Sequence, residues 1–430
     1  MTLSETPPHY RRNFSALVTD FGFFGIAMAF VGPTTVVPGL LSTLGASASL
    51  IGLVATLQRA GWLLPQLISA RYMANKPYKK PYILWAAGAS RLLFLFLAGL
   101  LWATGARPSN LILAIFVPVF SLFWIGDGFG SLPWFDLLSK TIPPYRRGRL
   151  TSVGQVLSGL FGFLAGFAVE WILGDQGPSY PNNYASLFFI AFLMLAVSFV
   201  AISLIIERKG VSARVMPTWR EYLPQLWRVL NEDRAFRRYT IARQFLNLNA
   251  LATPFYMTYA LEALHLPAQV AGRYTSIGVV GGILAAILFG WVNEQRGTKQ
   301  AIQISVFITA AIPLVAILIP LLLPDSPWLA WAYGLVFFTY NASMSSYMPA
   351  WTAYMLELAP EAERPMYVGL NNTLNGVTTL FSTLGGLILY WTDNNYILLF
   401  ILTTVGTLAT YPLAASLPEP RGEVDTSRGR

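Results

Sequence analysis

The sequence is a succession of apolar segments of about twenty residues, the length that crosses the hydrocarbon core of a bilayer as an α-helix. One long polar stretch, residues 207–238, interrupts this succession. The apolar segments before it lie near residues 14–38, 50–70, 82–103, 110–132, 151–173 and 184–206. Those after it lie near residues 239–262, 270–292, 300–323, 328–349, 366–390 and 396–417. We therefore predict an all-α integral membrane protein with twelve transmembrane helices.

The composition supports this class and excludes others. Hydrophobic residues make up 55% of the chain and charged residues 11%, far below the charged fraction of soluble proteins. The net charge of +9 does not indicate a nucleic-acid partner, because the basic residues lie in short clusters between apolar segments. The chain has no cysteine, and its two histidines, His9 and His265, are far apart and outside the predicted helices. No metal, cofactor or thiol chemistry is expected.

The basic clusters predict the orientation in the membrane. Alternate loops are basic, and the basic residues of the first half on that side are Arg11, Arg12, Arg71, Lys76, Lys79, Lys80, Lys140, Arg146, Arg147 and Arg149. The opposite side offers only Arg107 in its loops. By the positive-inside rule, both termini and the central polar stretch are cytoplasmic, and we expect a multi-pass protein of the plasma membrane.

The central polar stretch is predicted to contain a helix. Thr218-Trp219-Arg220-Glu221 has the pattern of a capping box, and the apolar residues after it follow one helical face. Two interpretations remain open, a helix lying at the membrane surface and a solvated linker helix. Either way, the chain divides into an N-terminal bundle (1–206), a linker (207–238), a C-terminal bundle (239–417) and a cytoplasmic tail (418–430).

The two halves repeat each other. Trp134, Pro143, Arg147 and Gly159 recur as Trp351, Pro360, Arg364 and Gly376, each 217 residues later. A duplicated six-helix unit with a basic cytoplasmic connection predicts two bundles related by a pseudo-twofold axis along the membrane normal.

The segment Gly290-Trp-Val-Asn-Glu294-Gln295-Arg296-Gly297-Thr298-Lys299 resembles the signature loop of the major facilitator superfamily. Glu294 stands where that family has aspartate, and Gln295 stands where arginine is usual. The corresponding first-half loop, residues 69–80, has lost both the glycine and the acid. The resemblance covers nearly the whole chain and implies a monomeric membrane transporter of a small-molecule substrate, with no enzymatic activity. It also implies a cytoplasmic gate formed by Asp136, Arg147, Glu294, Gly297 and Arg364.

Ionisable side chains inside membrane segments are costly and therefore indicate function. Four of them lie deep in the first half, namely Asp20, Arg59, Arg91 and Asp127. The alternative for these four is a set of internal ion pairs that orient the bundle. Arg243, close to the start of its predicted helix, is expected to extend its guanidinium to the cytoplasmic surface.

The remaining candidates for substrate binding are uncharged. Trp124 lies one helical turn from Asp127 and could form an aromatic platform for a ligand. The second half offers the amides Asn247, Asn341, Asn371 and Asn372, which either bind a polar ligand or join helices.

The hypothesis drawn from these residues is secondary active transport coupled to protons. Asp127 is the first choice of proton carrier and Asp20 the second, with Arg59 either as the counter-charge or as the anchor for an anionic substrate. The alternatives are a facilitative uniporter, a drug or lipid exporter, and a membrane receptor or enzyme. An enzyme is disfavoured, because the chain lacks cysteine and has no histidine in a predicted helix.

Overall fold

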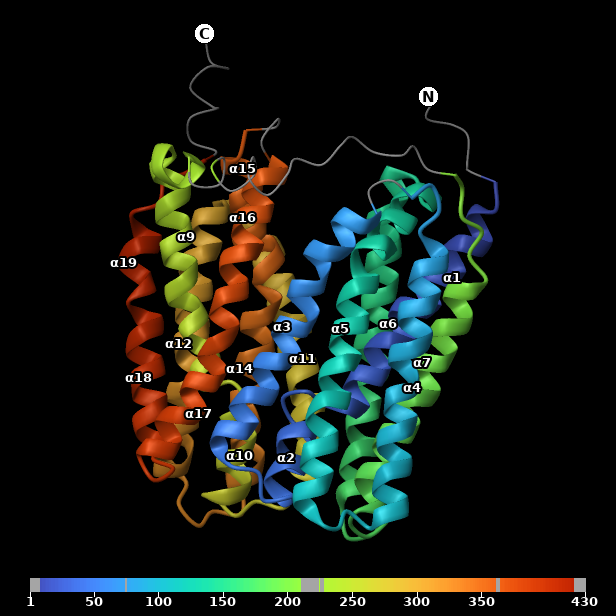
Figure 1. Ribbon diagram of the computed structural model, residues 1–430. Coiled ribbons are helices and arrows are strands. Elements are labelled where there is room, and N and C mark those ends of the chain that lie inside the picture. Colours follow the sequence, from blue (N-terminus) through green and yellow to red (C-terminus); the bar gives the residue numbers. More distant parts are fainter. Residues whose placement is uncertain (1–7, 74–75, 210–223, 225–227, 361–363, 421–430) are drawn as a thin grey trace. The chain divides into compact units, whose positions relative to one another are not determined.

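The computed structural model describes residues 8–73, 76–209, 224, 228–360 and 364–420. Every regular element in this part of the chain is helical, which confirms the predicted all-α fold (Figure 1). The chain forms two compact units. Unit 1 comprises Met1–Ala46, Leu57–Met216 and Pro267–Ser276, and unit 2 comprises Ser47–Thr56, Pro217–Leu266 and Ile277–Arg430. The boundaries expected at 206, 238 and 417 stay a prediction.

Unit 1 is built from long helices. They are α1 (Tyr10–Val31), α2 (Val36–Thr43), α3 (Ala48–Met73, of which unit 1 holds the part from Leu57), α4 (Lys80–Thr104), α5 (Ser109–Thr141), α6 (Pro144–Leu173) and α7 (Asn182–Ser203). Helix α1 packs against α6 and α7, and α4 packs against α5 and α7 (Figure 1). One buried cluster in this unit includes Leu17, Ile83, Leu137, Leu150 and Ile202.

Unit 2 has more interrupted helices. They are α9 (Arg234–Leu246), η1 (Asn247–Leu251), α10 (Phe255–Glu262), α11 (Val270–Arg296, of which unit 2 holds the part from Ile277), α12 (Thr298–Leu322), α13 (Leu329–Ala332), α14 (Gly334–Ser345), η2 (Tyr347–Thr352), α15 (Ala353–Leu358), α16 (Arg364–Val377), η3 (Thr378–Leu380), α17 (Phe381–Trp391), α18 (Tyr396–Leu408) and α19 (Thr410–Ala415). Its core cluster includes Phe236, Tyr239, Phe289, Trp351 and Tyr354.

All twelve predicted spans overlap these helices, although not all are regular. Within the described residues, eight helical stretches are long and apolar enough to cross a membrane. Three of the other spans are divided by short 3-10 helices or turns, at 247–251, at 333 and at 378–380. The fourth, α3, is continuous, but Gln58, Arg59 and Gln66 lower its mean hydropathy.

The outer surface of each unit is apolar, as a bilayer requires. Large apolar residues such as Trp85, Leu321 and Leu322 have exposed fractions of 74%, 68% and 75%. A soluble protein rarely exposes so many large apolar residues together, so these surfaces are suited to lipid.

The predicted capping box at 218–221 lies outside the described residues, so the linker helix stays a prediction. The described chain shows a capped helix start slightly later, where the Asp233 carboxylate accepts a hydrogen bond of 2.9 Å from the backbone N–H of Phe236. Helix α9 begins at the next residue, Arg234, because the Asp233 cap satisfies a backbone donor that the helix leaves unpaired.

Candidate functional site

Unit 1 contains a cavity of about 370 Å³. Helices α1, α3, α4, α5, α6 and α7 all contribute to its lining. Its lining is mainly apolar and includes the aromatic residues Phe21, Phe24, Trp62, Trp134 and Phe135. Its charged lining residues are Asp20, Arg91 and Asp127. Three of the four charged residues predicted to carry function therefore meet at one cavity.

Asp20 is held firmly by its neighbours. Its carboxylate is buried and accepts a 2.6 Å hydrogen bond from the indole N–H of Trp134 and another from the Ser198 hydroxyl. The guanidinium Nη2 of Arg91 lies 3.6 Å from its Oδ1. Helices α1, α4, α5 and α7 are thereby joined through one carboxylate, which is the geometry of a structural ion pair.

Arg91 is also largely buried, and one nitrogen of its guanidinium has no hydrogen-bond partner among the described residues. Its carbon Cζ lies 5.8 Å from the ring centre of Phe199, and Nη1 has no hydrogen-bond partner among the described residues. Arg91 interacts electrostatically with Asp127 as well as with Asp20. One arginine therefore serves two carboxylates, which leaves the cavity with one acid in excess.

Asp127 lies on α5 between two glycines that bring other helices close. A Cβ atom at Gly128 would lie 2.5 Å from the Trp62 carbonyl oxygen, and one at Gly126 would lie 2.7 Å from the Ser90 Cβ. The Trp62 side chain forms a hydrogen bond with Asp127. Within the described residues, Asp127 forms no ion pair at the short distance seen for Asp20. The glycines permit close helix packing, and Asp127 keeps free acceptor capacity facing the cavity.

Arg59 and Trp124 do not line this cavity. Arg59 lies on α3 in unit 1 and is half-buried. Trp124 packs edge-on against Phe120 and Phe123, and its indole N–H is buried without a partner in the described chain. Neither residue is among those that hydrogen-bond with Asp127 or interact electrostatically with it.

The four amides belong to unit 2. Asn247 donates to the side-chain oxygens of Asn375 (2.9 Å) and Thr378 (3.0 Å). Asn341 donates to the Phe337 carbonyl of its own helix at 3.0 Å, while Asn371 is buried and Asn372 half-buried. The pairing of Asn247 joins η1 to α16 and η3, which corresponds to the helix-joining alternative for that residue.

The paired loops of the predicted gate share one backbone interaction. Arg147 donates from Nη2 to the Ser139 carbonyl at 2.8 Å, and Arg364 donates from Nε to the Leu356 carbonyl at 3.2 Å. Each arginine reaches the carbonyl eight residues before it, at positions 217 residues apart in the chain. This equivalence, seen separately in each unit, supports the internal repeat.

The second-half signature loop has a backbone reason for its glycine. Gly297 has φ of 85°, a conformation that L side chains rarely adopt, and it directly precedes α12. A Cβ there would also lie 2.9 Å from the Glu419 carboxylate. Glu294, in contrast, is exposed.

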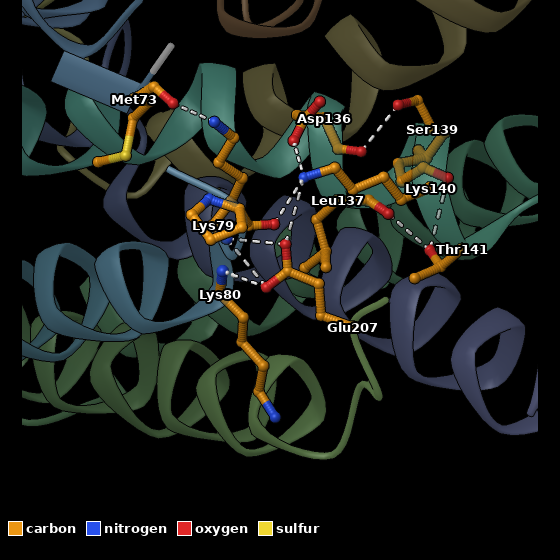
Figure 2. A network of polar contacts seen from close by, with 11 residues as sticks. Met73, Lys79, Lys80, Asp136, Leu137, Ser139, Lys140, Thr141 and Glu207 are labelled. Carbon is orange, nitrogen blue, oxygen red and sulfur yellow. Dashed lines mark hydrogen bonds and ion pairs between the residues drawn. The ribbon is translucent and has the colours of Figure 1, made fainter. Parts of the chain in front are cut away.

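A carboxylate that the sequence did not reveal organises the first-half loop. Figure 2 shows Glu207, just beyond α7, reaching the start of α4. Its oxygens accept hydrogen bonds of 2.7 and 2.9 Å from the Lys79 N–H and of 2.8 Å from the Lys80 N–H. Lys140 lies 3.5 Å from the same carboxylate and 2.6 Å from Asp136. The acid missing from this loop is therefore replaced by one that follows 127 residues after Lys80.

Lys79 completes this network (Figure 2). Its ammonium donates to the Met73 carbonyl. Burial lowers the pKa of Lys79, the Asp136 charge raises it, the Lys140 charge lowers it and the Glu207 charge raises it. The net direction is downward, so desolvation outweighs the two acids.

One sequence signal could have identified Glu207. The same pattern follows the last helix of each half, namely a glutamate, a basic residue two positions later and then a glycine. It occurs as Glu207-Arg208-Lys209-Gly210 and as Glu419-Pro420-Arg421-Gly422. Glu207 lies at the start of α4 and Glu419 lies beside Gly297 at the start of α12. Each unit thus places a carboxylate at the N-terminus of its third long helix, where the helix dipole favours an anion.

Comparison with known proteins adds a family and a fold. The family model of the Major Facilitator Superfamily matches residues 19–383. An uncharacterized protein of Mycobacterium tuberculosis is 24% identical over 430 residues, which covers 95% of this chain and 77% of the relative.

Solved structures share the fold at low identity. A mutant of the nucleoside transporter NupG matches with a TM-score of 0.68 and 12% identity, covering 95% of this chain and 99% of that one. A bacterial homologue of the iron transporter ferroportin in its inward-facing state gives 0.66 and 14%, covering 95% and 98%. A POT family transporter in complex with 5-aminolevulinic acid gives 0.66 and 12%, covering 94% and 96%.

Proposed function

This chain belongs to the Major Facilitator Superfamily and is a membrane transporter, and from that premise we propose that it is a proton-coupled secondary active transporter of a small solute. It works by alternating access, in which the N-terminal and C-terminal bundles rock against each other. Asp127 is the proton carrier and Arg91 is its counter-charge. The structures of similar fold name a nucleoside, iron and 5-aminolevulinic acid, so the fold does not select the cargo.

The observation that carries this proposal is the difference between the two acids of the cavity. Asp20 is engaged by Trp134, Ser198 and Arg91. Asp127 lines the same cavity with a single hydrogen bond, from Trp62, and no ion pair within the described residues. A close ion pair favours the ionised form of a carboxyl, whereas a carboxyl without one in a mainly apolar lining can bind and release a proton more readily.

Arg91 supplies the switch. An apolar surround favours the neutral form of a carboxyl, and a nearby cation favours the ionised form. Arg91 interacts with both acids, so a movement that brings its guanidinium closer to one acid and farther from the other changes the proton affinity of Asp127. Such movement is what alternation between inward-facing and outward-facing states provides.

The test uses purified protein in proteoliposomes. Asp127→Asn should abolish uphill accumulation driven by an imposed pH gradient and leave exchange of labelled substrate down its own gradient at least partly intact. Asp175→Asn, which alters an exposed acid in the loop after α6, is the matched control and should behave as wild type. Accumulation by Asp127→Asn at the wild-type level would show that Asp127 is structural and would favour a facilitative uniporter.

We also propose that the protein lies in the plasma membrane as a monomer, with both termini and the central linker in the cytoplasm. The distribution of lysine and arginine between the two sets of loops supports this orientation.

A further inference from the structure

Unit 2 contains an arginine whose Nε atom is buried and which forms no ion pair with any carboxylate in the part of the chain that the structure describes. Arg243 lies on α9, nine residues after the helix begins at Arg234 and therefore about 13 Å along its axis. No acid among the described residues forms an ion pair with it, whereas Arg91 and Arg273 pair with Asp20 and Glu170. A guanidinium inside a membrane helix requires a partner of some kind.

Aromatic rings hold the guanidinium in place. Its carbon Cζ lies 4.6 Å from the ring centre of Tyr347 and 5.1 Å from that of Trp351. The Tyr239 hydroxyl, one turn before Arg243 on α9, donates to the Trp351 carbonyl at 3.1 Å. Tyr347 and Trp351 both belong to η2, a π-helical turn. Turns of this kind are rare and are found frequently at functional sites.

The ring contacts leave the Nε–H of the guanidinium without a hydrogen-bond partner among the described residues. This Nε atom of Arg243 is buried. The adjacent Gln244 likewise has a buried Nε2 without a partner. The planar edge of an arginine binds carboxylate and phosphate groups through two parallel hydrogen bonds, and stacking on rings does not use that edge.

Further hydrogen-bonding groups continue along the same helix. The Asn247 N–H donates to the Arg243 carbonyl, so the two residues lie one turn apart. The Asn247 amide is already fixed by Asn375 and Thr378. The charge of Arg243 is therefore followed by a rigid, neutral polar cluster, which would suit a small organic anion with polar substituents.

We propose that Arg243, held between Tyr347 and Trp351, binds the carboxylate or phosphate group of a small anionic solute. This goes beyond the proposed function, since it assigns a binding site in unit 2 and does not depend on proton coupling. A purely structural role would need only the ring contacts and would leave stability indifferent to the anion present.

The test measures thermal unfolding of the purified full-length protein in detergent, with potassium succinate or potassium phosphate titrated against potassium chloride at equal ionic strength. Wild type should show a saturable rise in Tm with at least one of these two anions. Arg243→Gln should lose that rise, and Arg243→Lys should retain it with an apparent Kd at least about tenfold weaker, because lysine keeps the charge but not the fork.

The matched control is Arg146→Gln. Arg146 also stacks over two rings, those of Tyr10 and Tyr145 at 6.0 and 5.5 Å, but it lies at the end of unit 1 where α6 begins. Its anion response should equal that of wild type. The absence of a saturable response in wild type, or an equal response in wild type and Arg243→Gln, would overturn the proposal. If Arg243→Gln does not fold, Arg243→Lys decides, because an unchanged Kd in that variant would also overturn it.

Discussion

The Glu207 carboxylate offers a test of how unit 1 is held together at the start of α4. Its two oxygens accept three close contacts from two backbone N–H groups, and only 4% of its side chain is exposed. Glu207→Gln keeps the shape but turns one oxygen into an N–H₂ group that faces backbone donors. The variant also loses the charge that Lys140 approaches at 3.5 Å.

The expected cost follows from these contacts. Losing one hydrogen bond to a charged acceptor costs about 1.5–3 kcal/mol. Removing an anion from a helix N-terminus adds about 0.3–1 kcal/mol. We therefore expect Glu207→Gln to reduce the free energy of unfolding by about 2–4 kcal/mol, the sum of these two effects.

The neighbouring acid is a matched control. Asp136 pairs with Lys140 at 2.6 Å, but 39% of its side chain is exposed and the pair is an i,i+4 contact on one helix. Such pairs contribute about 0.3–0.5 kcal/mol, so Asp136→Asn should be nearly neutral. Unfolding in mixed micelles of dodecyl maltoside and increasing dodecyl sulfate measures both variants. Equal destabilisation by the two substitutions would refute the reasoning, because it would mean that the buried carboxylate contributes no more than an exposed one.

Two further predictions address packing and orientation. Gly128→Ala should lower the free energy of unfolding by about 1–3 kcal/mol, since its Cβ would lie 2.5 Å from the Trp62 carbonyl oxygen. Gly130→Ala should be tolerated, because the atom nearest to its Cβ would lie 3.9 Å away, and equal thermal stability of the two variants would contradict this reasoning. A reporter domain fused after Arg430 should be active only in its cytoplasmic form, and a tag detected on the outside of intact cells would disprove the predicted topology.

The positions of the helices could be predicted because apolar length and basic loops follow from the physics of the bilayer. The interruptions in unit 2 could not, since segments such as 239–262 and 366–390 have the length of a single transmembrane helix and their polar residues do not specify where a helix is interrupted. The 3-10 turn at Asn247–Leu251 and the π-helical turn at Tyr347–Thr352 depend on packing and hydrogen bonds that are distant in sequence.

The charged residues of the cavity were predictable as a set but not in their pairing. Membrane depth alone singles out Asp20, Arg59, Arg91 and Asp127. Which of them meet depends on how each helix is rotated about its axis, and the sequence does not specify that rotation when apolar residues cover every face. The structure pairs Arg91 with Asp20 and leaves Arg59 outside the cavity lining.

Arg243 shows the same limit. A position close to the start of a helix permits an arginine to extend to the membrane surface. The structure instead shows its guanidinium over Tyr347 and Trp351, more than a hundred residues later. No local pattern reveals that contact.

Each half places a charged side chain of its first helix against the equivalent tryptophan, at the indole N–H in unit 1 and over the ring in unit 2, where the indole N–H donates to Ser305. In unit 1, Asp20 of the first helix accepts a hydrogen bond from Trp134, and in unit 2, Arg243 of the first helix stacks on Trp351. Trp134 and Trp351 are equivalent positions of the internal repeat. Among the described residues, the cavity of the first half therefore has two carboxylates and one arginine, and the second half has an arginine without an ion pair. A duplicated unit that needed these charges only for folding would have no reason to invert them. A carrier that binds a proton in one half and an anion in the other has such a reason, because one proton and one monovalent anion then cross the low-dielectric membrane together without net charge.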